Sequence, residues 1–261
     1  SAKRSFQEDI INDFSCIHLD PSITLNQKLN TEDIIERLNE LYEFCWGVAK
    51  AHKKDIIFEI GTEEQSGGTN TAEELEYVIK RINDNCTKHN LPKPTFVVVQ
   101  MGTKVVERRN IGSIDCPVRL ENEISPEIQI PKMIEICNRN NILVKSHNTD
   151  YLSSETLNWH PKLGIHAANV APEFGVTETL SMIKTLRQNY LDNICDEILD
   201  LALQSKKWEK WLLPNSRAND EEKAIIACHY IFSNKNFLEL KEKAKIDLSK
   251  RGINLDQELK N

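Results

Sequence analysis

The sequence lacks several features that would assign it to a specialised class of protein. No apolar run approaches the roughly 20 residues of a transmembrane helix, so the chain is not expected to enter a membrane. The formal net charge of -7 argues against nucleic acid as the main partner. Seven cysteines occur without any C-x-x-C pair, which excludes a zinc ribbon and a regular disulfide framework. We therefore expect reduced, mostly buried thiols in a cytoplasmic protein.

Nucleotide-binding and metal-binding motifs are also missing. The chain contains only nine glycines and no G-x-x-x-x-G-K-S/T loop, and its only adjacent glycine pair is Gly67-Gly68. No H-E-x-x-H motif occurs either. We therefore expect no nucleotide cofactor, and any metal site would have to be assembled from residues that are distant in the sequence.

The sequence does contain a regular alternation of strand-like and helical segments. Five short apolar runs are typical of buried parallel strands, at residues 14–19, 55–60, 95–101, 142–144 and 163–165. Apolar residues at helical spacing predict helices between most of these strands, one with Thr31 as its N-cap and others at 71–89 and 130–139. Four more helices are predicted at 173–189, 191–205, 220–232 and 237–249.

This alternation predicts a parallel α/β fold. A TIM-type (β/α)8 barrel has eight strands. Five strands therefore fit either an open sheet or the last five βα units of a barrel whose first three strands lie outside this chain. The abrupt start at Ser1, within a helix-like segment, favours the barrel. We expect a barrel portion over residues 1–190 and a C-terminal helical extension, packed on the barrel, over residues 191–261.

Polar side chains gather where the predicted strands end. In parallel α/β folds, ligands bind outside the carboxyl ends of the strands. This position makes four residues candidate metal ligands, namely His147, His166, His18 and Asp20, and it makes Asp150 a candidate catalytic residue. A purely local role is the alternative in each case. His147 and Asp150 would then cap a strand and a turn, and His166 would pack in the core.

Two loops provide further candidates. The segment I-G-T-E-E-Q-S-G-G follows the second strand; Glu63 is a candidate for proton transfer, and Gly67 and Gly68 are candidates for phosphate binding. Val170 and Ala171 precede a helix with a proline in its first turn. Since the N–H groups at a helix N-terminus attract anions, these two residues are also candidate phosphate ligands.

The stretch from 102 to 126 is irregular and long, as functional loops often are. It carries Arg108, Arg109 and Arg119. Guanidinium groups suit phosphate binding, so these arginines are candidates for a second phosphate clamp. Solvated arginines, or arginines that contact a partner, are the alternative.

Five motifs occur in the same order as in a known family: F-S-C-I-H-L-D, I-G-T-E-E-Q-S-G-G, V-V-V-Q-M-G, S-H-N-T-D-Y and W-L-L-P-N-S-R. From about residue 14 to residue 217, the chain resembles the non-catalytic subunit family of class II D-tagatose-1,6-bisphosphate aldolase. The resemblance implies a (β/α)8 barrel, with the strands of this chain similar to its last five. It also implies a role in carbohydrate metabolism, alongside enzymes of galactitol or N-acetylgalactosamine breakdown.

One segment departs from that family. Where the family has a K-V-G-P-A-L-T turn, this chain has H-A-A-N-V-A-P-E-F-G, from His166 to Gly175. The A-N-V-A-P-E part resembles the N-V-A-T-E turn with which catalytic class II aldolases hold a substrate phosphate and hydroxyl. This second resemblance implies that Asn169 binds substrate, and it leaves a distinct substrate or a distinct subfamily open.

Two roles on phosphorylated ketoses remain open. The protein is either an accessory subunit that stabilises a separate catalytic aldolase, or itself a metal-dependent lyase or epimerase. In the second role a divalent ion such as zinc would stabilise an enediolate as a Lewis acid. A sugar-phosphate kinase ranks last because no nucleotide site is evident. In each role we expect a phosphorylated sugar as the ligand and an oligomeric assembly.

Overall fold

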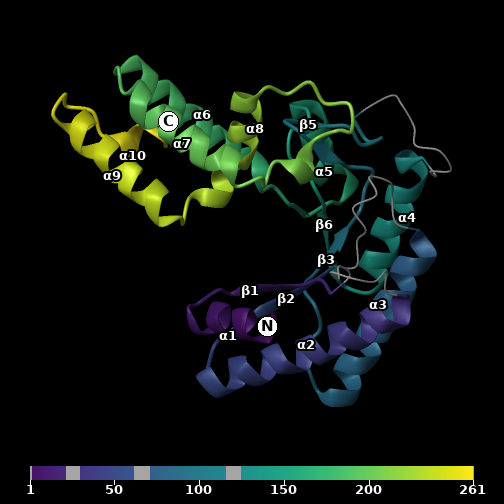
Figure 1. Ribbon diagram of the computed structural model, residues 1–261. Coiled ribbons are helices and arrows are strands. Elements are labelled where there is room, and N and C mark those ends of the chain that lie inside the picture. Colours follow the sequence, from purple (N-terminus) through teal and green to yellow (C-terminus); the bar gives the residue numbers. More distant parts are fainter. Residues whose placement is uncertain (1, 22–29, 62–70, 116–124, 261) are drawn as a thin grey trace. The chain divides into compact units, whose positions relative to one another are not determined.

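The computed structural model describes residues 2–21, 30–61, 71–115 and 125–260 (Figure 1). Two compact units make up the chain. The first comprises Ser1–Lys104 and Ile111–Asn169, and the second comprises Val105–Asn110 and Val170–Asn261. Within the described ranges, no helix combines the length and the hydropathy that crossing a bilayer requires.

The first unit is built on a parallel sheet. Its strands are β1 (Cys16–Leu19), β2 (Ile57–Gly61), β3 (Phe96–Val99), β6 (Leu143–Ser146) and β7 (Ala167–Ala168), in the order β1-β2-β3-β6-β7. Its helices are α1 (Ala2–Ile11), α2 (Thr31–His52), α3 (Ala72–His89), α4 (Pro126–Arg139) and α5 (Ser154–Leu163). The predicted parallel α/β class is confirmed. Among the described residues the sheet has β1 and β7 at its two edges.

Local side-chain bonds set the ends of the long helices. The Asn30 side chain accepts a hydrogen bond from the Asp33 backbone N–H at 2.9 Å, so the N-cap of α2 is Asn30 and not Thr31 as predicted. Helix α3 begins with a capping box between Thr71 and Glu74. Helices α2 and α3 both end at a residue in the left-handed region, Lys53 and Asn90 respectively.

The two faces of the sheet differ in chemistry. Alternate strand residues pack into one apolar core with helices α1 to α4; on the strands this set is Ile17, Leu19, Phe58, Ile60, Val97, Val99 and Val144. The ring of Tyr42 on α2 stacks on Phe58 with centroids 3.9 Å apart. Because side chains alternate along a strand, His18, Glu59 and Lys145 lie on the opposite face. The charged residues of the sheet are therefore directed away from the helix-packed core.

The segment between β6 and β7 differs from the prediction. The apolar run at 163–165 is not a strand, because Leu163 is the last residue of α5 and Gly164 caps that helix with a φ of 88°. The strand begins at Ala167, two residues after the end of the predicted run, and ends at Ala168. The short run L-G-I was ambiguous between a strand and a helix end, and the interior Pro161 concealed the helix.

The second unit is mainly helical. It contains α6 (Pro172–Gln188), α7 (Asp192–Gln204), α8 (Asp220–Ala227), α9 (Lys235–Ser249) and α10 (Leu255–Glu258), with 3-10 turns η1 (Glu209–Trp211) and η2 (Cys228–Ile231). The four predicted C-terminal helices are present, although the third ends at Ala227 and continues as η2. A short antiparallel hairpin, β4 (Val105–Val106) and β5 (Arg109–Asn110), also belongs to this unit.

The second unit has its own apolar core. Helices α6, α7, α8 and α9 contribute buried residues such as Leu186, Ile198, Ile225 and Phe237.

Cysteines contribute to both cores. Among the described cysteines, Cys45, Cys86, Cys137, Cys195 and Cys228 are buried free thiols and Cys16 is an exposed one. These residues agree with the expectation of unpaired, mostly buried thiols.

Candidate functional site

A buried carboxylate on the sheet face opposite the helix-packed core joins three strands. Lys145 Nζ on β6 lies 2.9 Å from Oε2 and 3.1 Å from Oε1 of Glu59 on β2. His18 Nδ1 on β1 lies 2.9 Å from Glu59 Oε1. His18 and Glu59 are paired in the parallel ladder, whereas Lys145 reaches Glu59 across β3. We call these three residues the Glu59 cluster.

The pKa of Glu59 shows that the cluster holds a charge. Burial raises the pKa of this carboxyl, but hydrogen bonds from His18 and Lys145 outweigh it and keep the pKa below its ordinary value. Glu59 is therefore ionised at neutral pH. An ionised carboxylate only accepts hydrogen bonds, so the proton of the contact lies on His18 Nδ1.

The neighbouring thiol of Cys16 responds to the same charge. Burial and the negative charge of Glu59 both raise the pKa of Cys16, while Lys145 lowers it to a smaller extent. Cys16 therefore stays a thiol at neutral pH, although it is exposed. This environment does not suit a nucleophilic cysteine.

His147 follows β6 at the carboxyl edge of the sheet and is 8% exposed. Its backbone N–H donates to the Val99 carbonyl at 3.1 Å, and its carbonyl accepts from the Thr103 hydroxyl at 2.5 Å. Burial lowers the pKa of His147 to about 4, even though the negative charge of Asp20 acts in the opposite direction. His147 and Asp20 are thus close enough to interact, and the imidazole is neutral at pH 7.

The loop after His147 is strongly constrained. Asn148 and Tyr151 both adopt left-handed backbone conformations, with φ of 48° and 59°. The backbone N–H and the hydroxyl of Thr149 donate to the Asn169 carbonyl at 3.0 Å and 2.9 Å. Asp150 in this loop is buried, at 1% exposed. The predicted residues Asp150 and Asn169 are therefore held at the ends of β6 and β7.

His166 has a different role from the other histidines. It is exposed, its backbone N–H donates to the Val144 carbonyl at 2.9 Å, and its Nδ1 accepts from the Val144 N–H at 3.2 Å. The ring therefore extends the pairing between β6 and the segment that enters β7. Only Nε2 of this histidine would be left for a metal ion.

Several predicted residues lie elsewhere. Glu63, Gly67 and Gly68 fall outside the described residues, as does Arg119. Val170 and Ala171 begin the second unit, directly before Pro172, the first residue of α6. The N-cap position of α6 is Ala171, which makes no side-chain capping bond.

The candidate metal ligands do not form a complete site in the described part of the chain. No three of its His, Cys, Asp and Glu side chains are grouped as a metal ion requires. His18 already binds Glu59, and the Nδ1 of His166 already accepts from β6. We therefore derive no chemical step through a metal ion from these residues.

Sequence reasoning missed Glu59 and Lys145. Each interrupts an otherwise apolar strand, in D-I-I-F-E-I and in I-L-V-K-S. A charged residue inside a buried strand is costly unless it is paired, so one acid and one base in two such strands form a recognisable signal. Their shared position on one face becomes evident only with the sheet order.

Comparisons with known proteins identify a shared fold. No protein-family model matches the sequence, and no curated protein sequence matches it. A probable tagatose 6 phosphate kinase from Sinorhizobium meliloti 1021 matches with a TM-score of 0.67 and 14% identity, covering 95% of this chain and 64% of that one. The fructuronate-tagaturonate epimerase UxaE from Cohnella laeviribosi, complexed with glycerol, matches with a TM-score of 0.59 and 11% identity, covering 98% and 64%.

A weaker likeness, with a TM-score of 0.48 and 10% identity, involves the YdjI aldolase from Escherichia coli K12 and covers 94% of this chain and 63% of that one. We base no argument on it. At these identities the first two matches indicate a similar fold and nothing more. The chain spans less than two thirds of the length of each of these structures.

Proposed function

We propose that this chain belongs to a TIM-type (β/α)8 barrel protein of carbohydrate metabolism that binds a phosphorylated ketose. Three observations support the proposal. The strands are parallel, one face is packed with helices, and the other face carries the Glu59 cluster. In a barrel that second face would point inward, and ligands would enter from the carboxyl ends of the strands. The two stronger fold matches bear names of enzymes that act on tagatose 6-phosphate and on sugar acids.

The single observation that carries the proposal is the geometry of the Glu59 cluster. Glu59 holds the Lys145 ammonium and the His18 ring at 2.9 Å each. The Lys145 ammonium has three N–H donors and can also donate to the carbonyl, hydroxyl or phosphate oxygens of a sugar. Glu59 itself is a positioning residue, because its lowered pKa makes it a weak base. Lys145 is therefore the proposed substrate-contacting group, and His18 is a second positioning residue through its contact with Glu59.

His147 and Asp150 are the remaining candidates for contact with substrate. A pKa of about 4 makes His147 a poor general base at neutral pH, because proton transfer is most efficient when the pKa is close to the working pH. A neutral imidazole still accepts a hydrogen bond or binds a cation. We propose that His147 orients the ligand, with Asp20 beside it, and that Asp150 is the candidate acid–base residue.

A second proposed role is that of an accessory subunit of a catalytic aldolase. Such a subunit would keep a sugar-binding face without a complete metal site, which agrees with the incomplete grouping of metal ligands among the described residues. In that role the partner is the catalytic subunit and the ligand is the same class of sugar phosphate. A protein that catalyses aldol cleavage or epimerisation by itself is the alternative that the test must separate.

The test uses the full-length protein with tagatose 6-phosphate as the probe. We expect calorimetry to detect binding, and we expect Lys145→Met to weaken it at least ~10-fold through loss of a charge-assisted contact. Lys3→Met is the matched control, because Lys3 forms a surface ion pair with Glu40 in the same unit. Circular dichroism must show that both variants are folded at the temperature of measurement. Absence of binding by the parent protein, or an equal loss in the control, would reject the proposal.

Activity measurements then separate the two roles. NMR assays of cleavage, epimerisation and ATP-dependent phosphorylation are run with and without a catalytic aldolase subunit, and metal content is measured for the parent protein and for His147→Ala. Turnover by the isolated protein, with a metal that the variant loses, supports a self-sufficient enzyme. Ligand binding without turnover, combined with stimulation of the aldolase, supports the accessory role.

A further inference from the structure

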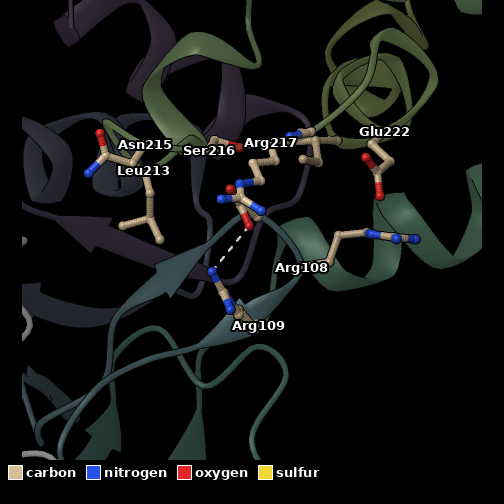
Figure 2. A pocket seen from close by; sticks show the side chains of 10 residues that line it. Arg108, Arg109, Leu213, Asn215, Ser216, Arg217 and Glu222 are labelled. Carbon is tan, nitrogen blue, oxygen red and sulfur yellow. Dashed lines mark hydrogen bonds and ion pairs between the residues drawn. The ribbon is translucent and has the colours of Figure 1, made fainter.

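A cavity of about 480 Å³ lies entirely within the second unit (Figure 2). One wall is the tip of the β4–β5 hairpin with Arg108 and Arg109, and the other is the segment from Leu213 to Ile226, which includes Arg217. Figure 2 shows Arg217 reaching from its loop toward the hairpin that carries Arg109, with Arg108 on the side of Glu222. Three guanidinium groups therefore line one concave site.

The backbone of the hairpin places these arginines. Glu107 occupies the turn with a φ of 56°, a conformation that favours glycine, and its N–H donates to the Trp211 carbonyl at 2.8 Å. This bond ties the hairpin tip to the segment that carries Arg217. The Glu107 carboxylate also lies 3.4 Å from Arg109 Nη2, so Arg109 is oriented and its charge is balanced.

The other two arginines are not balanced. Among the described residues, no carboxylate lies within ion-pair distance of Arg108 or Arg217. Glu222 also lines the cavity, but its Oε2 accepts the Asn219 N–H at 2.8 Å in the capping box of α8. The cavity therefore carries three arginines against two carboxylates, and Arg108 and Arg217 are the two lining cations to which the described residues give no carboxylate partner.

We propose that this cavity binds a phosphate monoester or inorganic phosphate through Arg108 and Arg217. The excess of positive charge favours an anion, and each of these two guanidinium groups can donate two parallel hydrogen bonds to phosphate oxygens. Ser216 adds a hydroxyl donor, because its Oγ accepts from the Ala218 N–H at 3.2 Å and keeps its own hydrogen. Asn215 adds an amide at the rim. The lining residues all belong to the second unit, whereas the residues of the Glu59 cluster belong to the first.

The experiment measures phosphate binding by the full-length protein at constant ionic strength. Inorganic phosphate and tagatose 6-phosphate are titrated by calorimetry against the parent protein and the Arg108→Ala/Arg217→Ala double variant. We expect the double variant to bind at least ~10-fold more weakly, since it loses charge-assisted hydrogen bonds. Both arginines are exposed, so the double variant should fold normally. Arg139→Ala on α4 is the control for a change in net charge.

Two further variants make the result specific. An Arg108→Lys/Arg217→Lys variant keeps the two positive charges but lacks the planar guanidinium groups that donate paired hydrogen bonds. We expect its affinity for phosphate to lie between those of the parent protein and the double alanine variant. The titrations are repeated in the Lys145→Met background, so that failure of the Glu59 cluster and failure of this cavity are distinguished. No binding of either probe in that background, or equal weakening by Arg139→Ala, overturns the proposal. Tighter binding of the sugar phosphate than of phosphate identifies the ester as the ligand, and equal binding identifies the free anion.

Discussion

Lys145 Nζ contacts both oxygens of Glu59, at 2.9 Å and 3.1 Å, although the two residues are 86 positions apart in the sequence. They lie on β6 and β2, with β3 between them, where Phe96 pairs with Glu59 and Val98 pairs with Lys145. Glu59 is 3% exposed, and a carboxylate so deeply buried is stable only when it is paired. The contact therefore links the stability of the sheet to the chemistry of the face opposite its helix-packed core.

Removal of Lys145 should destabilise the protein. The Lys145→Met variant leaves Glu59 with His18 as its ion-pair partner among the described residues, and we expect a loss of about 3 kcal/mol in the free energy of unfolding. Urea denaturation followed by circular dichroism measures it. Lys3→Met removes only an exposed pair and should cost less than about 1 kcal/mol.

A double-mutant cycle with Glu59→Leu tests the pairing directly. Once Glu59 is also replaced by an apolar residue, the penalty of Lys145→Met should shrink, because no unpaired buried carboxylate remains. Additive effects of the two substitutions would contradict the proposed coupling.

Asp115 should make the start of α5 sensitive to acid. Its carboxylate accepts from the Ser153 N–H at 2.9 Å and from the Thr156 hydroxyl at 2.6 Å. Partial burial raises the pKa of Asp115, but these hydrogen bonds outweigh it and lower the pKa below its ordinary value of 3.8. Because the folded-state pKa is the lower one, the stabilisation is complete above the ordinary pKa and is lost as the pH falls through the folded value.

The Asp115→Asn variant should therefore be less stable by about 1 kcal/mol at pH 7, and the difference should diminish as the pH falls below about 4. Thermal denaturation of the variant and the parent protein across this pH range measures it. Asp84→Asn, at an exposed position on α3, is the matched control and should show no such dependence. A difference that grows toward acid pH would contradict the interpretation.

Gly175 should not tolerate a side chain. A Cβ at this position would lie 2.4 Å from Cβ and 2.8 Å from Cγ of His229, so one of the two helices would have to shift. We expect Gly175→Ala to lower the free energy of unfolding by about 1–2 kcal/mol, because the free-energy cost of relieving the steric overlap exceeds the gain from the higher helix propensity of alanine. Urea denaturation provides the measurement.

Gly47 in α2 is the control for that substitution. A Cβ at Gly47 would have no heavy atom within 4 Å, so Gly47→Ala should stabilise the protein by about 0.5–1 kcal/mol through helix propensity alone. Equal effects of the two substitutions would show that His229 does not lie against Gly175.

The ion pair of Arg187 and Glu221 should contribute little despite good geometry. Two parallel hydrogen bonds of 2.9 Å join the guanidinium to the carboxylate, and they raise the pKa of Arg187 and lower that of Glu221. Both side chains are substantially exposed, at 40% and 45%. A double-mutant cycle with Arg187→Ala and Glu221→Ala should give a coupling of about 0.5–1 kcal/mol.

Salt provides the check on that coupling. At about 1 M ionic strength the Debye length falls to roughly 3 Å, so the coupling between exposed charges should decrease. An unchanged coupling would indicate that packing of the long side chains, and not charge, joins these two helices.

Helix α3 was among the more predictable parts of the fold. Helix α3 begins within one residue of the predicted start because Thr71 and Glu74 form a capping box, a signal contained in four consecutive residues. The last strand was predicted at 163–165 and not at its actual position, Ala167–Ala168, because L-G-I has the apolar character of a strand and the local signal of a helix end. The prediction was correct where a short segment contained an unambiguous helix-start signal, and it was wrong where the same residues fitted both a strand and a helix end.

The residues of the candidate site were also predictable from the sequence only in part. His147 and Asp20 could be selected from the sequence, since both follow an apolar run that predicts a strand. Glu59 and Lys145 could not be selected as a pair, because their meeting depends on the order β2-β3-β6 and on the register of each ladder.

By itself the sequence determined the alternation of strands and helices and the parallel α/β class, because those properties arise from periodicities of a few residues. The tertiary structure alone decided which distant charges meet. A strand exposes every second side chain to each face, so pairing between residues 86 positions apart is set by sheet order and register, which no local pattern encodes. The arginine-lined cavity of the second unit has the same origin, because a backbone bond from Glu107 to Trp211 brings a hairpin and a distant loop together.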